Sequence, residues 1–243
     1  MADTVVLRFP APGAAPDAAE WVTVDMHGAR SGDVGHGPLT AAAAAVGGRR
    51  LLVLVPGTEV MLAAPELPAR GGARLAKLAP FALEEQLATE IDAMHFAVGR
   101  PRADHRVPVA AVERERFAGW LAALEAAGLV PAAVFPDSLV VPDNPSHVVI
   151  VLDSDRIVVR RPGMLPLALE ADPLDAALAV AGLPAGAGET PDASHVLVYA
   201  ASADWPRHEK LVTATRPFTP MRSRSYQRPH TSASRIGGWV SSR

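Results

Sequence analysis

The 243-residue chain has no cysteine and no long apolar run. The first absence excludes disulfides, thiolate metal ligands and cysteine nucleophiles. The strongest candidate for a span, residues 39–46 (LTAAAAAV), is far shorter than the roughly 18 residues that a membrane-spanning helix needs. The N-terminal segment MADTVVLRF lacks a basic region followed by an apolar one, so no secretory signal is expected. These absences together predict a cytosolic chain.

Positive charge is scarce outside the C-terminal end. The formal net charge is −3, yet residues 221–243 contain five arginines (Arg222, Arg224, Arg228, Arg235 and Arg243) and no acid. The rest of the chain therefore has 18 bases against 26 acids, a balance of about −8. Non-specific nucleic-acid binding needs a cationic surface, so the acidic body predicts no nucleic-acid partner. The polar, unpatterned composition of residues 221–243 predicts disorder.

Motifs of enzymes and metal sites are also missing. The eight histidines show no HxH, HExxH or HxxxH spacing, so no zinc site is predicted, and His95 is interpreted as a core or edge residue. The glycine loop at 35–37 lacks GxGxxG and GK[ST], which favours an exposed turn. Ser138 lacks a GxSxG elbow, so we expect it to cap or form a turn. The sequence predicts no catalytic residue, no metal and no cofactor.

The first third of the chain is predicted to be rich in strands. Residues 4–9 (TVVLRF) and 21–26 (WVTVDM) are typical of strands, and residues 31–38 (SGDVGHGP) are typical of a turn-rich connector. Two apolar runs, Leu51–Val55 and Val60–Ala64, flank a Pro-Gly turn. Such runs separated by a short turn predict a buried hairpin.

A helical pattern follows, with its charges separated by sign, and residues 94–98 after it are typical of a strand. Basic residues precede Pro80 and the acids Glu84, Glu85, Glu90 and Asp92 follow it. Proline removes an amide donor and clashes with the preceding turn, so we expect a kink or two short helices. Since successive helical residues point about 100° apart, Glu84 and Glu85 do not converge on one point. The four acids are interpreted either as a solvated face or as a docking surface for a basic partner.

The remainder predicts the end of the first α/β unit and, from residue 147, a second unit. Expected elements are strands at 106–112 and 134–136, a helix at 113–128, three meander strands at 148–152, 157–159 and 165–169, a helix at 173–182 and a strand at 196–200. Strand meander, helix and strand thus occur twice along the chain. The pattern predicts an α/β duplication.

The ordered string from Val53 to Gly99 resembles one protein family. The sequence VLVPG, a short run ending in LP, and LAPFALEEQLATEIDAMHFAVG together resemble the cytoplasmic domain of protein L of the type II secretion system (GspL). The resemblance implies a duplicated actin-like (RNase-H-type) α/β fold with mixed sheets. We expect a first lobe at residues 1–145, a second β-meander lobe at 146–212 and a basic tail at 213–243.

ATP-binding members of the actin-like fold place an Asp-x-Gly turn after the first strand of each half. Glycine there lets backbone amides approach phosphate. In this chain the second-half turn reads Asp153-Ser154-Asp155, with no glycine and an added carboxylate. The first-half turn, residues 10–13 (PAPG), has no acid to hold Mg²⁺. The nucleotide site is therefore expected to be degenerate, and the chain is not expected to be an ATPase.

The resemblance implies a non-catalytic adaptor of the inner-membrane platform. Its expected partner is the N-terminal domain of the secretion ATPase, protein E, with platform protein M and a homodimer as further candidates. We expect the chain on the cytoplasmic side of the bacterial inner membrane, attached only through a transmembrane helix that follows in the family and is missing here. The candidate docking residues are Glu84, Glu85, Glu90 and Asp92. The alternative is a nucleotide-binding actin-like protein or ATPase.

Overall fold

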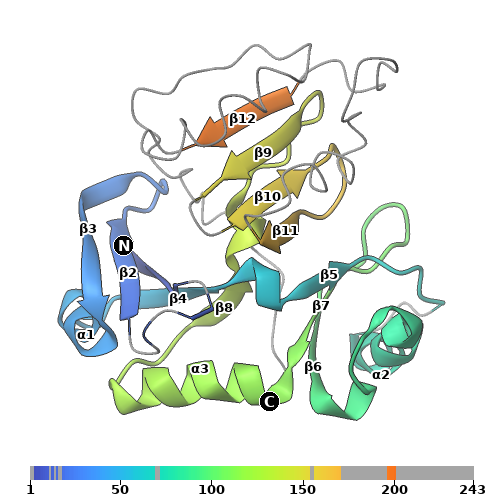
Figure 1. Cartoon of the computed structure of the whole chain (residues 1–243), viewed down its shortest axis with the longest axis horizontal. Coiled ribbons are helices and arrows are strands. Elements are labelled where there is room, and N and C mark those ends of the chain that lie inside the picture. Colours follow the sequence, from blue (N-terminus) through green and yellow to red (C-terminus); the bar gives the residue numbers. More distant parts are fainter. Residues whose placement is uncertain are drawn as a thin grey trace. The chain divides into compact units, whose positions relative to one another are not determined.

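A computed structural model describes residues 3–170 and 196–200, apart from residues 11, 14, 16, 17, 69–71, 154 and 155. The chain divides into two compact units, the first running to Asp137 and the second beginning at Ser138. Figure 1 shows their elements, and each unit is described by itself below. The expected helix at 173–182 lies outside the described residues.

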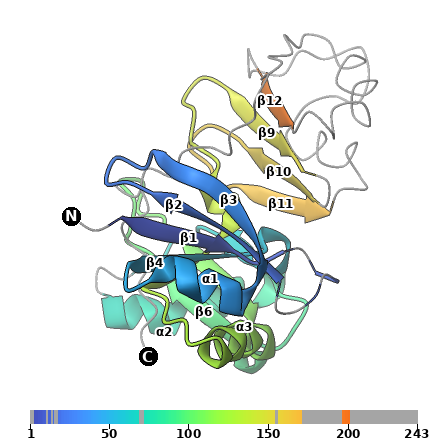
Figure 2. The same ribbon diagram turned by 90° about the vertical axis from the view of Figure 1, so that its left-hand side faces the viewer.

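The first unit contains a five-stranded mixed sheet. Its strands are β1 (Thr4–Arg8), β2 (Ala18–Val24), β3 (Arg30–Pro38), β4 (Arg50–Val55) and β8 (Ala133–Pro136). They lie in the order β3-β2-β1-β4-β8. Figure 2 shows the first four of these strands side by side. The β1–β2 and β2–β3 pairs are antiparallel, whereas β4 is parallel to both β1 and β8. The carboxyl ends of β1, β4 and β8 consequently meet at one edge.

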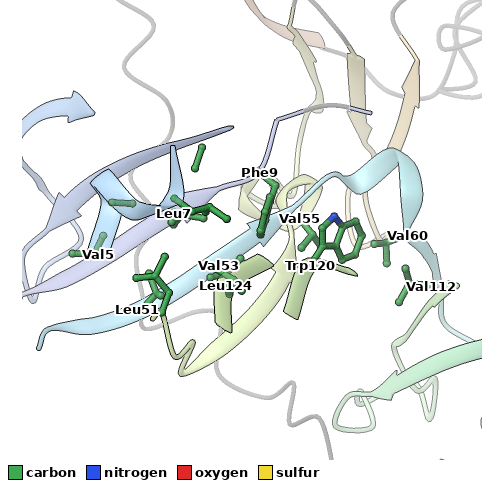
Figure 3. Close-up of a cluster of buried hydrophobic side chains, with 14 of the residues drawn as sticks. Val5, Leu7, Phe9, Leu51, Val53, Val55, Val60, Val112, Trp120 and Leu124 are labelled. Carbon is green, nitrogen blue, oxygen red and sulfur yellow. The ribbon is translucent and has the colours of Figure 1, made fainter. Parts of the chain in front are cut away.

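Two helices, α1 (Leu39–Val46) and α3 (Arg114–Ala126), supply side chains to the core of this sheet. Figure 3 shows the cluster, in which Leu7, Val53 and Val55 come from the strands and Trp120 and Leu124 from α3. These apolar side chains alternate along β1 and β4, so one face of each strand meets the helices. Gly47 ends α1 in the left-handed conformation that glycine adopts without strain.

A second, three-stranded sheet completes the first unit. It has the order β5-β7-β6, with β5 (Met61–Ala63), β7 (Val109–Glu113) and β6 (Met94–Val98) all antiparallel. Helix α2 (Gly72–Leu83) packs beside β6, and its Ala79 and Leu83 are buried with Val109. The strand predicted at 94–98 and the helix predicted at 113–128 are confirmed by β6 and α3.

The predicted hairpin of Leu51–Val55 with Val60–Ala64 is wrong. β4 pairs with β1 and β8, while β5 pairs with β7 in the other sheet. Between them lies a short 3-10 turn, η1 (Gly57–Glu59), which carries the chain from one sheet to the other. Leu51–Val55 is buried, as its composition indicates, whereas residues 61–64 are half-buried. The hydrogen-bond partners of both runs come from distant parts of the sequence.

The expectation of a connector at 31–38 is also wrong, because residues 30–38 form β3. Its glycines are used in packing: a Cβ placed on Gly35 would lie 2.3 Å from Cε2 of Trp21. The indole of Trp21 therefore covers the backbone of β3 directly. The pairing with β2 satisfies the amides of a segment whose composition resembles a loop.

Helix α2 continues through Pro80 as one helix to Leu83, so the expected division into two short helices does not occur. A 3-10 turn, η2 (Glu84–Gln86), follows directly. Leu75 and Leu83 are buried, but Phe81, an apolar residue of the same helix, is 65% exposed. The apolar residues after Lys77 thus face two different environments.

The second unit repeats the strand arrangement of the first. β9 (Val148–Leu152), β10 (Arg156–Arg160) and β11 (Leu167–Glu170) form the predicted meander, and β12 (Val196–Ala200) is parallel to β9. The order β11-β10-β9-β12 therefore corresponds to β3-β2-β1-β4, with the same pairing directions. The repeat confirms the predicted α/β duplication.

Candidate functional site

The four predicted docking acids lie on two consecutive turns. Glu84 and Glu85 belong to η2, Glu90 precedes η3 (Ile91–Ala93) and Asp92 lies within it. All four residues are exposed, and none makes an ion pair with another described residue. The backbone carbonyl of Asp92 accepts a hydrogen bond of 3.1 Å from Nη2 of Arg114. Segment 84–92 is thus an exposed, uncompensated acidic surface.

Phe81 adds an aromatic side chain next to these acids. It precedes Glu84 and Glu85 by three and four residues, in the last turn of α2. That last turn has no basic residue, so the negative end of the helix dipole reinforces the nearby carboxylates. We call Phe81, Glu84, Glu85, Glu90 and Asp92 the acidic surface. An exposed aromatic residue that closely precedes exposed acids in the sequence suits a basic partner that offers an apolar contact.

A second set of polar residues lies at the carboxyl edge of the parallel strands. Nε of Arg8, at the end of β1, donates to Oδ2 of Asp137 at 3.2 Å, at the start of η4 (Asp137–Val140). The amide of Gly57, after β4, donates to Oδ1 of Asp137 at 2.9 Å. Both charged side chains are buried. The ends of three parallel strands are therefore joined by one carboxylate and its guanidinium partner.

A row of charged side chains on neighbouring strands extends this ion pair across the sheet. Glu20 on β2 lies opposite both Arg8 on β1 and His36 on β3. Its Oε2 is 3.3 Å from Nη1 of Arg8, and its Oε1 is 3.4 Å from Nδ1 of His36. The carboxylates of Glu20 and Asp137 thus contact different nitrogens of the Arg8 guanidinium. None of these residues is singled out by a motif, although an arginine inside the apolar run TVVLRF is the one local signal.

The edge of an open α/β sheet at its carboxyl ends is where such folds ordinarily bind ligands. Here a buried guanidinium occupies that edge, and its charge is met by Asp137 and Glu20. The Gly57 amide, the kind of donor that a phosphate needs, donates to Asp137. Within the described residues no group of His, Asp and Glu is placed to hold a metal ion. The charged side chains at this edge thus form ion pairs and hydrogen bonds with one another.

The corresponding turn of the second unit is described only at its ends. Nη2 of Arg156 donates to Oδ2 of Asp153 at 3.2 Å, and the amide of Asp153 donates to the carbonyl of Arg156 at 2.9 Å. Ser154 and Asp155, on which the expected loss of the second phosphate loop depends, lie outside the described residues. Ser138 lies in the η4 turn, as expected, and its hydroxyl is buried.

A cavity of about 430 Å³ lies in the first unit beside α3. Its lining is mainly apolar and includes Phe117, Trp120 and Leu121 of α3, Val130 and His95. The imidazole of His95 is stacked on Phe117, with ring centroids 4.3 Å apart. Burial lowers the pKa of His95, and the Arg114 charge lowers it further. His95 is half-buried on the edge strand β6, which agrees with its interpretation as a core or edge residue.

Across the described ranges, none of the helices has the length and apolar character to span a membrane.

Comparison with known proteins gives one consistent family. The sequence model of the family described as "Type II secretion system (T2SS), protein L" matches residues 9–203. Protein L of Pectobacterium carotovorum subsp. carotovorum is 42% identical over 92 residues, which are 38% of this chain and 21% of that protein. Protein L of Dickeya chrysanthemi is 33% identical over 129 residues, covering 52% of this chain and 32% of that protein. The chain thus matches a third or less of each of these relatives.

The fold has a counterpart of known structure. The cytoplasmic domain of EpsL, an inner-membrane component of the type II secretion system of Vibrio cholerae, aligns with a TM-score of 0.67 and 17% identity. The alignment covers 93% of this chain and 88% of that domain. Together with the repeated strand order, this likeness confirms the duplicated actin-like α/β fold with mixed sheets.

Proposed function

The chain belongs to the protein L family of the type II secretion system, and we propose that it acts as a non-catalytic adaptor that recruits the secretion ATPase, protein E. Membership makes it a component of the secretion machinery. In this proposal its partner is the N-terminal domain of the ATPase, and platform protein M is a second partner. It would act on the cytoplasmic side of the inner membrane. The division into lobes at 1–145 and 146–212 with a basic tail stays a prediction.

The ion pair of Arg8 and Asp137 is the observation that supports a non-catalytic role. Nucleotide binding at the first half would need a cation and free amides at the carboxyl edge of β1 and β4. In this chain the cation is a guanidinium already neutralised by two carboxylates, and the Gly57 amide already donates. A phosphate would have to displace a buried carboxylate that holds three strand ends. The alternative function, a nucleotide-dependent actin-like protein, lacks a supporting observation of this kind.

The acidic surface is the proposed docking site for the ATPase. Its four carboxylates are exposed and unpaired among the described residues, so a basic partner would meet them without first breaking ion pairs. Phe81 supplies exposed apolar area beside them. Complementary charge raises the association rate, and a buried aromatic contributes most of the affinity in many interfaces. Binding should therefore weaken with salt and depend on Phe81.

The test is a binding assay between this chain and the N-terminal domain of the cognate ATPase, with and without Mg-ATP. The adaptor function predicts binding that is indifferent to nucleotide, and calorimetry should detect no ATP uptake by this chain alone. ATP uptake without ATPase binding would favour the nucleotide-dependent alternative.

Charge reversal tests whether the ATPase docks on the acidic surface. E84K/E85K/E90K/D92K should reduce the association rate at low salt by roughly tenfold or more, and F81A should raise the dissociation rate. A control that is matched in charge to E84K/E85K reverses two exposed acids elsewhere, D33K/E170K, and should bind like the parent chain. Unchanged binding of the quadruple variant would eliminate the acidic surface while leaving the adaptor function open to mapping elsewhere.

A further inference from the structure

The cavity beside α3 takes its walls from both sheets of the first unit. Its volume of about 430 Å³ is bounded by strands β4, β6, β7 and β8 and by α3. Figure 3 shows four of its lining side chains next to one another, namely Val55, Val60, Val112 and Trp120. No residue of the acidic surface or of the ion-pair network around Arg8 lines it. The cavity is therefore a feature that the proposed function does not use.

The space exists because small side chains line the sheet under α3. Ala97 on β6 is paired with Ala110 on β7, so two methyl groups stand where larger side chains would fill the space up to the helix. The segment 131–133 (PAA), which follows α3, adds only small side chains to the lining. Protein interiors ordinarily hold few voids larger than a water molecule. A cavity of this size is therefore an exception to ordinary packing, and it follows directly from the residues at its walls.

The aromatic part of the wall is held in place by contacts of its own. Trp120 is buried, and its ring centroid lies 6.5 Å from that of Phe9 in the core. Phe117 is stacked on His95, with the two ring planes only 10° apart. A ligand would not have to order these rings on binding, which preserves its affinity. Because aromatic pairs gain more than their buried area alone supplies, the wall favours an aromatic ligand.

The lining contains one polar side chain and no charge. No Lys, Arg, Asp or Glu belongs to it, and burial lowers the pKa of His95, so its imidazole is neutral at pH 7. A neutral imidazole offers one donor and one acceptor. Neither ring nitrogen has a hydrogen-bond partner among the residues that the structure describes. A charged ligand would lose its hydration here without meeting a counter-ion, whereas a hydroxyl group can donate to or accept from His95.

Size and access narrow the ligand further. An apolar cavity of about 150 Å³ holds benzene. A cavity of about 430 Å³ therefore has room for two or three fused rings, and it lies within the usual range of small-molecule sites. Leu121 is 38% exposed and Val130 is 82% exposed, and both belong to the lining, so the cavity reaches the surface beside apolar side chains.

We propose that this cavity binds a small uncharged aromatic molecule of two or three fused rings that carries a hydroxyl group. Its rings would lie against Trp120, and its hydroxyl would form a hydrogen bond with His95. The inference does not depend on ATPase binding, and either can fail without the other.

The first test uses 2-naphthol, which has two fused rings and one hydroxyl group. Equilibrium dialysis at neutral pH should show saturable binding to a single site, with a dissociation constant on the order of 100 micromolar. 2-Naphthoate, which carries a carboxylate in place of the hydroxyl, should bind at least tenfold more weakly because the cavity offers no counter-ion. Absence of saturable binding of 2-naphthol would overturn the proposal.

A filling variant tests where the molecule binds. A97L places a larger apolar side chain in the cavity and should weaken the binding of 2-naphthol by roughly tenfold or more. The matched control A118L makes the same change at an exposed position of α3 outside the lining and should bind like the parent chain. Melting curves check folding, and A132F, at an exposed lining residue, replaces A97L if that variant does not fold. Binding that the folded filling variant leaves unchanged would overturn the site.

The role of His95 is tested with a pair of ligands that differ only in the hydroxyl group. H95L should weaken the binding of 2-naphthol by about three- to tenfold, because it removes the hydrogen-bond partner. The same variant should leave the affinity for naphthalene within about twofold of the parent chain, since leucine keeps the wall apolar. An equal effect on both ligands, or no effect on 2-naphthol, would show that no hydroxyl is recognised at His95 and would overturn the proposed class of ligand.

Discussion

Arg8 and Asp137, 129 residues apart in sequence, form a buried ion pair in which Nε lies 3.2 Å from Oδ2. The pair joins the end of the first strand to the turn that follows the last strand of the same sheet. Asp137 also accepts the Gly57 amide, so its carboxylate binds two segments from separate parts of the chain. Removing the Asp137 carboxylate should therefore affect the attachment of both segments.

D137A should destabilise the first unit by about 3 kcal/mol, because it leaves the Arg8 charge buried with one counter-ion fewer and the Gly57 amide without its acceptor. Urea unfolding followed by tryptophan fluorescence measures this loss. The double variant R8M/D137N, which removes both charges and keeps an amide oxygen near Gly57, should lose less than the two single changes together. Strict additivity would show that the two side chains do not interact.

Two glycine substitutions should change the stability of the protein in opposite directions. G35A places a methyl group 2.3 Å from the Trp21 ring and should cost about 1–3 kcal/mol through overpacking. G119A, on the exposed side of α3 with no atom within 4 Å of the new Cβ, should stabilise by about 0.5–1 kcal/mol because alanine favours helices. Thermal melts of both variants against the parent chain measure the pair. Equal effects would contradict the packing of Trp21 on β3.

His95 should make stability sensitive to mild acid. Burial, aided by Arg114, lowers the pKa of His95 below the ordinary value of 6.5, so the unfolded chain takes up a proton before the folded chain does. Stability is therefore complete above about pH 6.5 and falls as the pH drops through that value toward the lowered pKa. H95F keeps a ring on Phe117 and should lose part of this pH dependence. H27Q, in an exposed turn, is the control, and melts at about pH 7.5 and 5.5 compare them.

The ion pair of Glu59 and Arg116 should contribute little at neutral pH, although Oε1 and Nε are only 2.7 Å apart. Burial raises the pKa of Glu59 despite the opposing effect of Arg116, and Glu113 raises it further. A raised pKa means that the folded protein gains stability as the pH falls below neutral through that pKa. E59Q should therefore be within about 1 kcal/mol of the parent at pH 7, since solvent screens the exposed arginine, and should lack the gain in acid. A large loss at pH 7 would contradict this.

The local sequence pattern was sufficient to predict most of the strands and helices of the fold. The meander β9–β11, the strands β1, β6 and β12, and the helix α3 all coincide with runs whose periodicity predicts them. The local pattern failed to predict pairing where a strand pairs with a strand that is distant in the sequence. β4 and β5 follow each other through a Pro-Gly turn, yet each pairs in a different sheet, because the chain crosses between sheets at η1. Pairing depends on tertiary contacts that a window of ten residues does not contain.

Composition also misled at β3, whose glycines and proline are typical of a loop. Pairing with β2 and cover from Trp21 outweigh that tendency. Among the candidate functional residues, the sequence indicates the four acids but not Phe81, because an apolar residue in an apolar pattern gives no sign of its exposure. Arg8 and Asp137 were missed because nothing local connects them. Only the arginine in an apolar strand indicates that a counter-ion must exist elsewhere.

The parallel arrangement of β1, β4 and β8 determines how much of the chain must be synthesised before the sheet can form. β1 is made first and lies between β2 and β4, but its second neighbour is complete only at Val55, and the sheet only at Pro136. Until Asp137 emerges, the nascent strand carries an arginine whose main counter-ion has not yet been translated. Contacts of such long sequence separation form slowly. Until β8 is translated, β4 is therefore an edge strand of an unfinished sheet, and such an edge is open to mispairing.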